Sequence, residues 1–376
     1  MRSSPLRILF VPLLFALAAA VPAAVQALPS EIKVGALETL TGDSSVYGLS
    51  IKAGLELAVD ELNASKYLGG AKLKLVVLDE KADKQEGISV INKLINDEKV
   101  SAVFGPTLSS VAFAADPVAQ KAGVPVIGTS TTAVGITDMG DFIFRDSLPQ
   151  SSFIPAPIEA AKAKLHVKKA ALIFESTNEY SKSESEVLKA ALKAAGIELA
   201  ATESYSHGDT DFRTQLNKLK LHRPDLLVIS ALAGEAVPVL QQAREVGLTV
   251  PIVGGNGLNS PNVVKVAQDA AEGLMVGAAW FRDSPSSLSQ AFVAAYKKKY
   301  SAVPDQFAAQ AYAGAYLLAT AIKNAGSADR QAIRDALGNL RNVDTVLGKF
   351  SFNEKRDPVH PSVTLVVKGG QYTLLP

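Results

Sequence analysis

The chain has 376 residues, of which 48% are hydrophobic and 20% are charged, and its formal net charge is +1. This length and balance suit a globular protein of two domains, and the lack of a basic stripe argues against nucleic-acid binding. The sequence contains no cysteine, which excludes thiolate metal sites, thiol catalysis and a lipid-anchored cysteine.

Residues 1–27 differ from the rest of the chain. Arg2 and Arg7 flank the start of an apolar run, ILFVPLLFALAAAVPAA, which is followed by small residues ending at Ala27. This is the pattern of a secretory signal peptide cleaved near Ala27. An amino-terminal membrane anchor is the alternative, because the apolar run is almost long enough to span a bilayer. The prolines and the small-residue site favour cleavage, so we expect an exported, periplasmic protein.

From residue 31 onward, strand patterns alternate with amphipathic helix patterns. Strands are expected first at 31–38, 71–80, 100–105, 123–128 and 141–147, with helices at 47–63, 84–98 and 109–122. The alternation restarts with strands at 168–175, 197–205, 224–230, 249–255 and 273–280, and helices at 181–195, 210–221, 234–246 and 261–269. Pro117 should kink or restart the helix that contains it. This pattern predicts an α/β protein with two doubly wound parallel sheets.

The regular alternation of strand and helix patterns ends after Trp280. Helices are expected at 286–300, 305–325 and 329–339, and strands return at 346–352 and 362–375. A run of helices after the second sheet is best placed back against the first sheet. We therefore expect one lobe from 28–147 plus 281–352 and a second from 148–280 plus 353–376. The chain would cross between lobes near 145–150, 279–284 and 351–357, which makes a multi-strand hinge that can bend.

A catalytic set is not evident in the sequence. The four histidines, His166, His207, His222 and His360, are scattered and have no carboxylate at metal-ligand spacing, so we expect surface histidines and no metal site. The stretch GTSTTAVG does not match the G-x-S-x-G elbow, and VGGNGLNS lacks the nucleotide-binding glycine signatures. We therefore expect a binding protein without a cofactor rather than an enzyme.

Polar and aromatic side chains gather where the predicted strands end. They are Tyr47, Ser109, Ser110, Ser130, Thr131, Thr132, Tyr180 and Asn256. Carboxyl ends of parallel strands meet at one edge of a sheet, so these side chains can face one cleft. Ser109 and Ser110 also begin a predicted helix, whose free N–H groups favour an anion. Ser109 could equally be a helix cap, and Tyr180 and Phe307 could be packing residues, but the joint pattern indicates a ligand site.

Five stretches together resemble a known family. They are IKVGALETLTGDSSVYGLSIKAGLELAVDELN, VSAVFGPTLSSVAFAADPVAQKAGVPVIGTSTTA, LQQAREVGLTVPIVGGNG, AAEGLMVGAAW and PDQFAAQAYAGAYLLATAI. In this order they are similar to the periplasmic solute-binding proteins of branched-chain amino-acid ABC transporters. The resemblance implies a periplasmic binding protein fold of type I, in which two lobes close on a small carboxylated ligand. It also implies delivery of that ligand to an inner-membrane ABC permease, and we expect a monomer.

The resemblance assigns roles to particular residues. It implies that Ser109 and Thr132, with backbone near Ser130, hold the ligand carboxylate. Tyr47, Tyr180 and Phe307 match aromatic positions of the family's cleft, although the loop before Tyr180 is about one residue longer than the family pattern.

Asn256 departs from the family pattern. Amino-acid binders of this family place an acid there, after the fourth strand of the second lobe, to pair with the ligand's ammonium. A neutral amide cannot compensate a buried charge. Either a nearby acid substitutes, with Glu38, Glu175 and Glu179 as candidates, or the ligand is an aromatic or aliphatic carboxylic acid or an amide without an ammonium. Both ligand classes stay open.

Two other classes of protein compete with a transport receptor. A sensory binding module of the same fold is one, and the signal-peptide pattern argues against it because cytoplasmic amide sensors of this fold lack such a segment. An exported hydrolase is the other, and the missing catalytic set argues against it.

Overall fold

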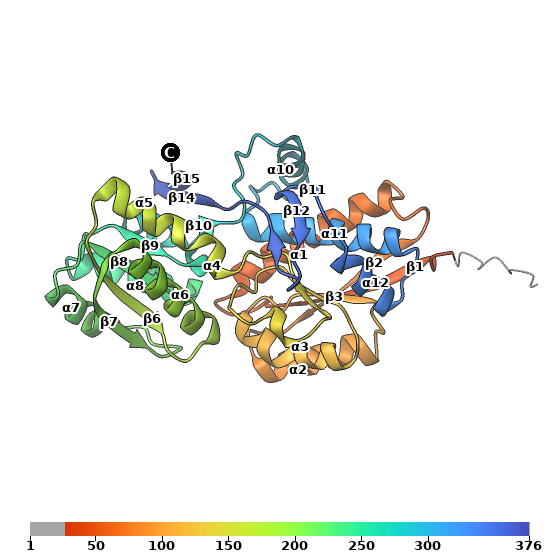
Figure 1. Cartoon of the computed structure of the whole chain (residues 1–376), viewed down its shortest axis with the longest axis horizontal. Helices are drawn as coiled ribbons and strands as arrows, with labels where there is room; N and C mark the ends of the chain where they lie inside the picture. The colour runs from red at the N-terminus through yellow and green to blue at the C-terminus, as the bar shows by residue number, and fades with distance from the viewer. Residues whose placement is uncertain (1–26, 376) are drawn as a thin grey trace, which may run out of the picture.

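The computed structural model describes residues 27–375 and arranges them as two lobes side by side along the long axis of the molecule (Figure 1). The predicted signal peptide lies outside the described residues except for Ala27. Among the described residues, no helix combines the length and apolar character needed to cross a membrane.

The first lobe is built on a five-stranded parallel sheet in the order β2-β1-β3-β4-β5. Its strands are β1 (Glu31–Glu38), β2 (Lys72–Asp79), β3 (Ala102–Phe104), β4 (Val126–Gly128) and β5 (Ile143–Arg145). Most of these strands are apolar runs because parallel strands covered by helices are buried on both faces. The helices that follow the first three strands are α1 (Ser45–Ala64), α2 (Lys84–Asn96) and α3 (Ser109–Lys121).

The second lobe is built on a seven-stranded sheet in the order β15-β14-β10-β9-β8-β6-β7. Its parallel strands are β6 (Lys169–Glu175), β7 (Glu198–Tyr205), β8 (Leu226–Ser230), β9 (Ile252–Gly254) and β10 (Leu274–Ala278). The strands β14 (Val363–Lys368) and β15 (Gln371–Leu374) add to its edge as an antiparallel hairpin. Its helices are α4 (Gln150–Phe153), α5 (Pro155–Leu165), α6 (Glu179–Ala195), α7 (Arg213–Leu221), α8 (Ala233–Glu245) and α9 (Pro261–Ala267).

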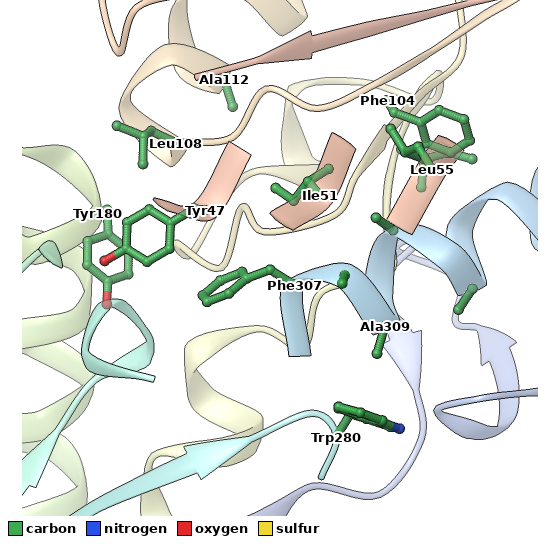
Figure 2. Packing of buried hydrophobic residues seen from close by; sticks show 14 of the residues in the cluster. Tyr47, Ile51, Leu55, Phe104, Leu108, Ala112, Tyr180, Trp280, Phe307 and Ala309 are labelled. Atoms are coloured by element: carbon green, nitrogen blue, oxygen red, sulfur yellow. The ribbon is translucent and has the colours of Figure 1, made fainter. Parts of the chain in front are cut away.

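The helices that follow the second sheet in the chain pack against helix α1 of the first lobe and against one another. They are α10 (Ser287–Tyr300), α11 (Gln306–Ala325) and α12 (Arg330–Gly338). Helix α11 packs along α1, where a Cβ on Gly54 would lie 2.2 Å from the Ala308 carbonyl oxygen. Only glycine allows the two helix backbones to approach so closely. Figure 2 shows this packing, with Ile51 and Leu55 of α1 beside α11.

Three short strands and three 3-10 turns complete the chain. Strands β11 (Val343–Thr345), β12 (Gly348–Phe352) and β13 (Pro358–Val359) form a small antiparallel sheet. The 3-10 turns lie at Thr137–Met139, Asn256–Leu258 and Gln268–Ala271. Strand β13 pairs with β12, Ser351 with Val359 and Phe352 with Pro358, in the stretch that follows the first-lobe helices and precedes the β14–β15 hairpin of the second sheet.

Helix α3 runs from Ser109 to Lys121 without a break at Pro117, so the helix does not start afresh there, and a kink at this proline stays a prediction. This proline lies on the exposed side of the helix, so the carbonyl that it leaves unpaired can bond to water.

Candidate functional site

A small cavity lies between the two lobes, at the carboxyl ends of both sheets. Its free volume is about 20 Å³, which is room for about one water molecule. We call it the inner cavity. Its lining residues are Tyr47, Thr107, Leu108, Ser109, Ser130, Tyr180, Leu232, Asn256, Gly257 and Phe307. Pockets for drug-sized ligands run to roughly 300 Å³ or more, so the lobes have to part before a ligand can enter.

The first-lobe wall is made of hydroxyl groups at the start of α3. Leu108 occupies the cap position and offers no side-chain bond, so Ser109 is the first helical residue rather than the cap. Its hydroxyl accepts a hydrogen bond from the Ala133 N–H at 3.3 Å, while the Ser130 hydroxyl donates to the Thr107 carbonyl at 2.5 Å. Since the first N–H groups of a helix lack partners within the helix, this wall is suited to an anion.

Aromatic rings close one side of the inner cavity. Tyr47 of α1 and Phe307 of α11 pack with ring centroids 4.9 Å apart. The Tyr47 hydroxyl donates to the Gly257 carbonyl at 2.6 Å, and Gln306 donates to the Asn256 side-chain oxygen at 2.6 Å. Both bonds run from the first lobe to the second, so they hold the cleft closed around the cavity.

The second-lobe wall rests on a buried carboxylate, Glu184 of α6. Tyr180 donates its hydroxyl to the Glu184 oxygens at 2.7 and 2.8 Å, and Ser230 donates at 2.7 Å. The Asn256 backbone N–H donates to the same carboxylate at 2.9 Å. Burial raises the pKa of Glu184 to about 7, and these donors oppose the rise.

Glycine at position 255 makes this arrangement possible. A Cβ there would lie 1.7 Å from a Glu184 oxygen, so a larger residue would displace the carboxylate. The Tyr180 hydroxyl also accepts from the Gly257 N–H at 2.7 Å. Figure 2 shows the Tyr180 and Tyr47 rings entering the site from the two lobes. Tyr180, Glu184 and the 255–257 turn therefore form one rigid wall.

The structure brings six of the predicted site residues to the inner cavity: Tyr47, Ser109, Ser130, Tyr180, Asn256 and Phe307. Ser110 instead lines a larger outer cavity of about 790 Å³ at the cleft mouth, which shares Leu108 and Leu232 with the inner one.

Thr131 and Thr132 are buried but do not line the inner cavity. The Thr131 carbonyl accepts from Arg145 at 3.0 Å, and the Thr132 carbonyl accepts from the Gln150 N–H at 3.0 Å. These two threonines support the first crossing between lobes.

The three acids proposed as ammonium partners lie outside the inner cavity. Glu38 is buried behind its wall, where it accepts the Thr107 hydroxyl at 2.6 Å. Glu175 and Glu179 line the outer cavity, and Glu179 forms an ion pair with Lys84 of the first lobe at 2.5 Å. The side chains that line the inner cavity, within the described residues 27–375, are all uncharged.

Sequence reasoning missed Thr107, Leu108, Leu232, Gly257 and Glu184. Leu232 and Gly257 follow strand ends, as the predicted residues do, but an apolar side chain and a glycine carry no polar signal. Glu184 follows Tyr180 by one helical turn, a spacing that places both side chains on one face. The spacing from Tyr180 is the one signal in the sequence that points to Glu184.

A family model for periplasmic binding proteins matches residues 31–371. The chain belongs to the periplasmic binding protein family. The expected fold of two lobes with parallel sheets is confirmed by solved structures of this family.

The relatives and structural neighbours include proteins for both ligand classes. The chain is 27% identical to the Leu/Ile/Val-binding protein BraC3 of Rhizobium johnstonii, over 89% of this chain and 91% of that protein. It is similar to the branched-chain amino acid transporter substrate-binding protein of Streptococcus pneumoniae in complex with isoleucine. The identity is 32% and the TM-score 0.86, over 91% of this chain and 97% of that protein. It is also similar to an ABC transporter solute-binding protein of R. palustris in complex with benzoate. The identity is 25% and the TM-score 0.84, over 92% of this chain and 95% of that protein.

Proposed function

We propose that this protein is the exported solute-binding receptor of an ABC importer, and that its ligand is a small carboxylic acid without an ammonium group. The inference of this ligand class rests on the uncharged lining of the inner cavity. Hydroxyls at the start of α3 can bind a carboxylate, whereas an ammonium at the second-lobe wall would meet the neutral Asn256. An unpaired buried charge costs several kcal/mol.

Glu184 does not change this inference. It is the acid nearest to Asn256 in the hydrogen-bond network, but Tyr180, Ser230 and the Asn256 N–H already donate to its two oxygens. To pair with an ammonium it would have to give up one of these bonds. A carboxylate that is already satisfied gains less from a new partner than a free one.

The family and the chain's sequence support the remaining parts of the proposal. The matching family model is that of periplasmic binding proteins, and the pattern at residues 1–27 is that of a signal peptide. Since the inner cavity is too small for the ligand, the lobes would open at the three chain crossings and close around it. The closed, monomeric complex would then dock on an inner-membrane permease.

A branched-chain amino acid is the second candidate ligand. The names of the curated relatives and the isoleucine complex of a structural neighbour favour it. In that case one of Glu38, Glu175, Glu179 or Glu184 would have to reach the ammonium.

A matched pair of ligands separates the candidates. Leucine and 4-methylpentanoate share a side chain and a carboxylate and differ in the ammonium. We expect 4-methylpentanoate or benzoate to raise the melting temperature, since a ligand at 100 times its Kd adds about 2.7 kcal/mol. The uncharged 4-methylpentanamide is the control and should not bind. Tighter binding of leucine than of 4-methylpentanoate would contradict the ligand class, and no response to any carboxylate would contradict the receptor.

A further inference from the structure

A second polar cluster lies in the second lobe, at the edge of the outer cavity. It consists of Glu175 at the end of β6, His207 after β7 and Glu235 in the first turn of α8. One possible ligand atom from each lies within 4.8 Å of the others. The His207 Nδ1 is 3.1 Å from a Glu235 oxygen and 3.9 Å from a Glu175 oxygen.

The two acids of this cluster are buried and the histidine is not. The side chains of Glu175 and Glu235 are 1% and 8% exposed, whereas that of His207 is 75% exposed. The Thr177 hydroxyl donates to one Glu175 oxygen at 2.8 Å. The two lysines of the outer cavity are engaged elsewhere, Lys84 with Glu179 and Lys81 with Glu86. The paired acids therefore lack a buried cation.

Unpartnered polar atoms point to the same place. The second oxygen of Glu175 and the hydroxyl of Tyr205 are buried, and neither has a hydrogen-bond partner among residues 27–375. Tyr205 is 3% exposed and lies directly opposite Glu175 in the parallel pairing of β6 and β7. Residues so paired project from the same face of a sheet. Buried polar atoms almost always have partners, so two unpaired ones beside a pair of acids indicate a missing ligand.

We propose that Glu175, His207 and Glu235 bind one divalent transition-metal ion of the Zn²⁺ type at the mouth of the cleft. Zinc takes imidazole nitrogen and carboxylate oxygen at about 2.0–2.2 Å, which sets neighbouring tetrahedral ligands about 3.4 Å apart. The His207 Nδ1 lies 3.1 Å from the Glu235 oxygen and 3.9 Å from the Glu175 oxygen, on either side of that value. Three protein ligands leave a fourth position open to the outer cavity. Calcium, which needs six to eight oxygens, does not suit this set.

The three ligands come from separate elements of one lobe. Residues 175, 207 and 235 are too far apart in the chain for a metal-binding spacing to be visible, so the sequence predicted a surface histidine. Because all three belong to the second lobe, the ion can bind whether the cleft is open or closed. This site is therefore independent of the proposed carboxylate ligand and can be tested without it.

Calorimetric titration with Zn²⁺ tests the site, using the chain without a polyhistidine tag after treatment with a chelator. We expect one Zn²⁺ per chain, and a loss of affinity of about tenfold or more in His207→Ala. His222→Ala is the matched control, because His222 is also exposed but lies outside the cluster, and its affinity should equal that of the unchanged protein. Glu235→Gln should weaken binding in the same way, with circular dichroism confirming the fold.

Cobalt gives a second readout. Co²⁺ should produce the intense visible absorption of a tetrahedral site, and His207→Ala should abolish it. The proposal is overturned if Zn²⁺ binding is not saturable, if His207→Ala binds as tightly as the unchanged protein, or if Ca²⁺ binds as tightly as Zn²⁺.

Discussion

Substituting Asn256 by Asp changes the charge of the second-lobe wall with little change in shape. The Asn256 side-chain oxygen accepts from Gln306 at 2.6 Å, and an Asp oxygen can keep that bond. What changes is one negative charge in a cavity that we expect to hold a carboxylate. With the two charges about 6 Å apart and an effective dielectric near 20, the repulsion is about 3 kcal/mol. Affinity for a carboxylic acid without an ammonium should therefore fall about 100-fold.

Calorimetry with 4-methylpentanoate and leucine measures this effect. For Asn256→Asp we expect weaker binding of 4-methylpentanoate and stronger binding of leucine, whose ammonium gains a partner. Asn262→Asp is the matched control, since it adds the same charge on the exposed face of α9 and should leave both affinities unchanged. Unchanged binding of both ligands to Asn256→Asp would refute the reasoning, because Asn256 would then not face the ligand.

Three further predictions follow from the site and its buried acids. Ser109→Ala should weaken carboxylate binding by roughly 10- to 100-fold, because a hydrogen bond to a charged group is worth about 1.5–3 kcal/mol. An unchanged Kd by calorimetry would show that Ser109 does not contact the carboxylate. Tyr47→Phe keeps the ring packing on Phe307 but removes the hydroxyl bonded to Gly257. Ligand affinity, measured by the same titration, should therefore fall about two- to tenfold, the loss of one neutral hydrogen bond, while the melting temperature stays close to that of the unchanged protein. A fall in affinity beyond about 100-fold would indicate that the hydroxyl contacts the ligand directly. Buried acids make the stability depend on pH, because burial raises the pKa of Glu80 to about 8 and that of Glu184 to about 7 from an ordinary 4.5. Burial also raises the pKa values of Glu38, Asp116 and Asp146 well above their ordinary range. Between pH 5 and 8 the unfolded chain has already lost most of these protons, whereas the folded chain still binds them until pH passes its raised pKa values, so the free energy of unfolding should fall as pH rises. Thermal unfolding followed by circular dichroism should give a lower melting temperature at pH 8 than at pH 5, and a rise over this interval would contradict the assignment.

The layout of the sheets could be predicted because buried parallel strands read as apolar runs between amphipathic helices. The short strand β13 was not expected from the sequence. Strand β13 is only two residues long, Pro358 and Val359, and it is defined by pairing with β12 rather than by any pattern of its own. Helices α4 and α5 were not predicted, because they begin at a turn rich in proline and serine that reads as a loop.

The site was predictable where polar side chains follow strand ends, since topology alone brings those ends together. The site was less predictable where the direction of a side chain decides whether the residue lines the inner cavity. Glu38 and Glu175 are the last residues of β1 and β6, close to the loops that supply the cavity residues. The Glu38 carboxylate nevertheless accepts from Thr107 behind the wall, and that of Glu175 lies near His207 outside the inner cavity. Glu184 sits in the run SKSESE, which reads as a solvated helix face, and only packing against the turn at Gly255 shows that it is buried.

Gly257 links the two walls of the inner cavity. Its carbonyl accepts from Tyr47 of the first lobe, and its N–H donates to Tyr180 of the second. Tyr180 in turn is fixed by Glu184, so the acid acts on the cavity by holding the acceptor in place rather than by offering charge. A wall fixed in this way can favour a ligand's shape and its single carboxylate without supplying a partner for an ammonium. The buried acid of the second lobe and the neutral Asn256 are thus compatible features of one site, because the first orients the wall and the second keeps it uncharged.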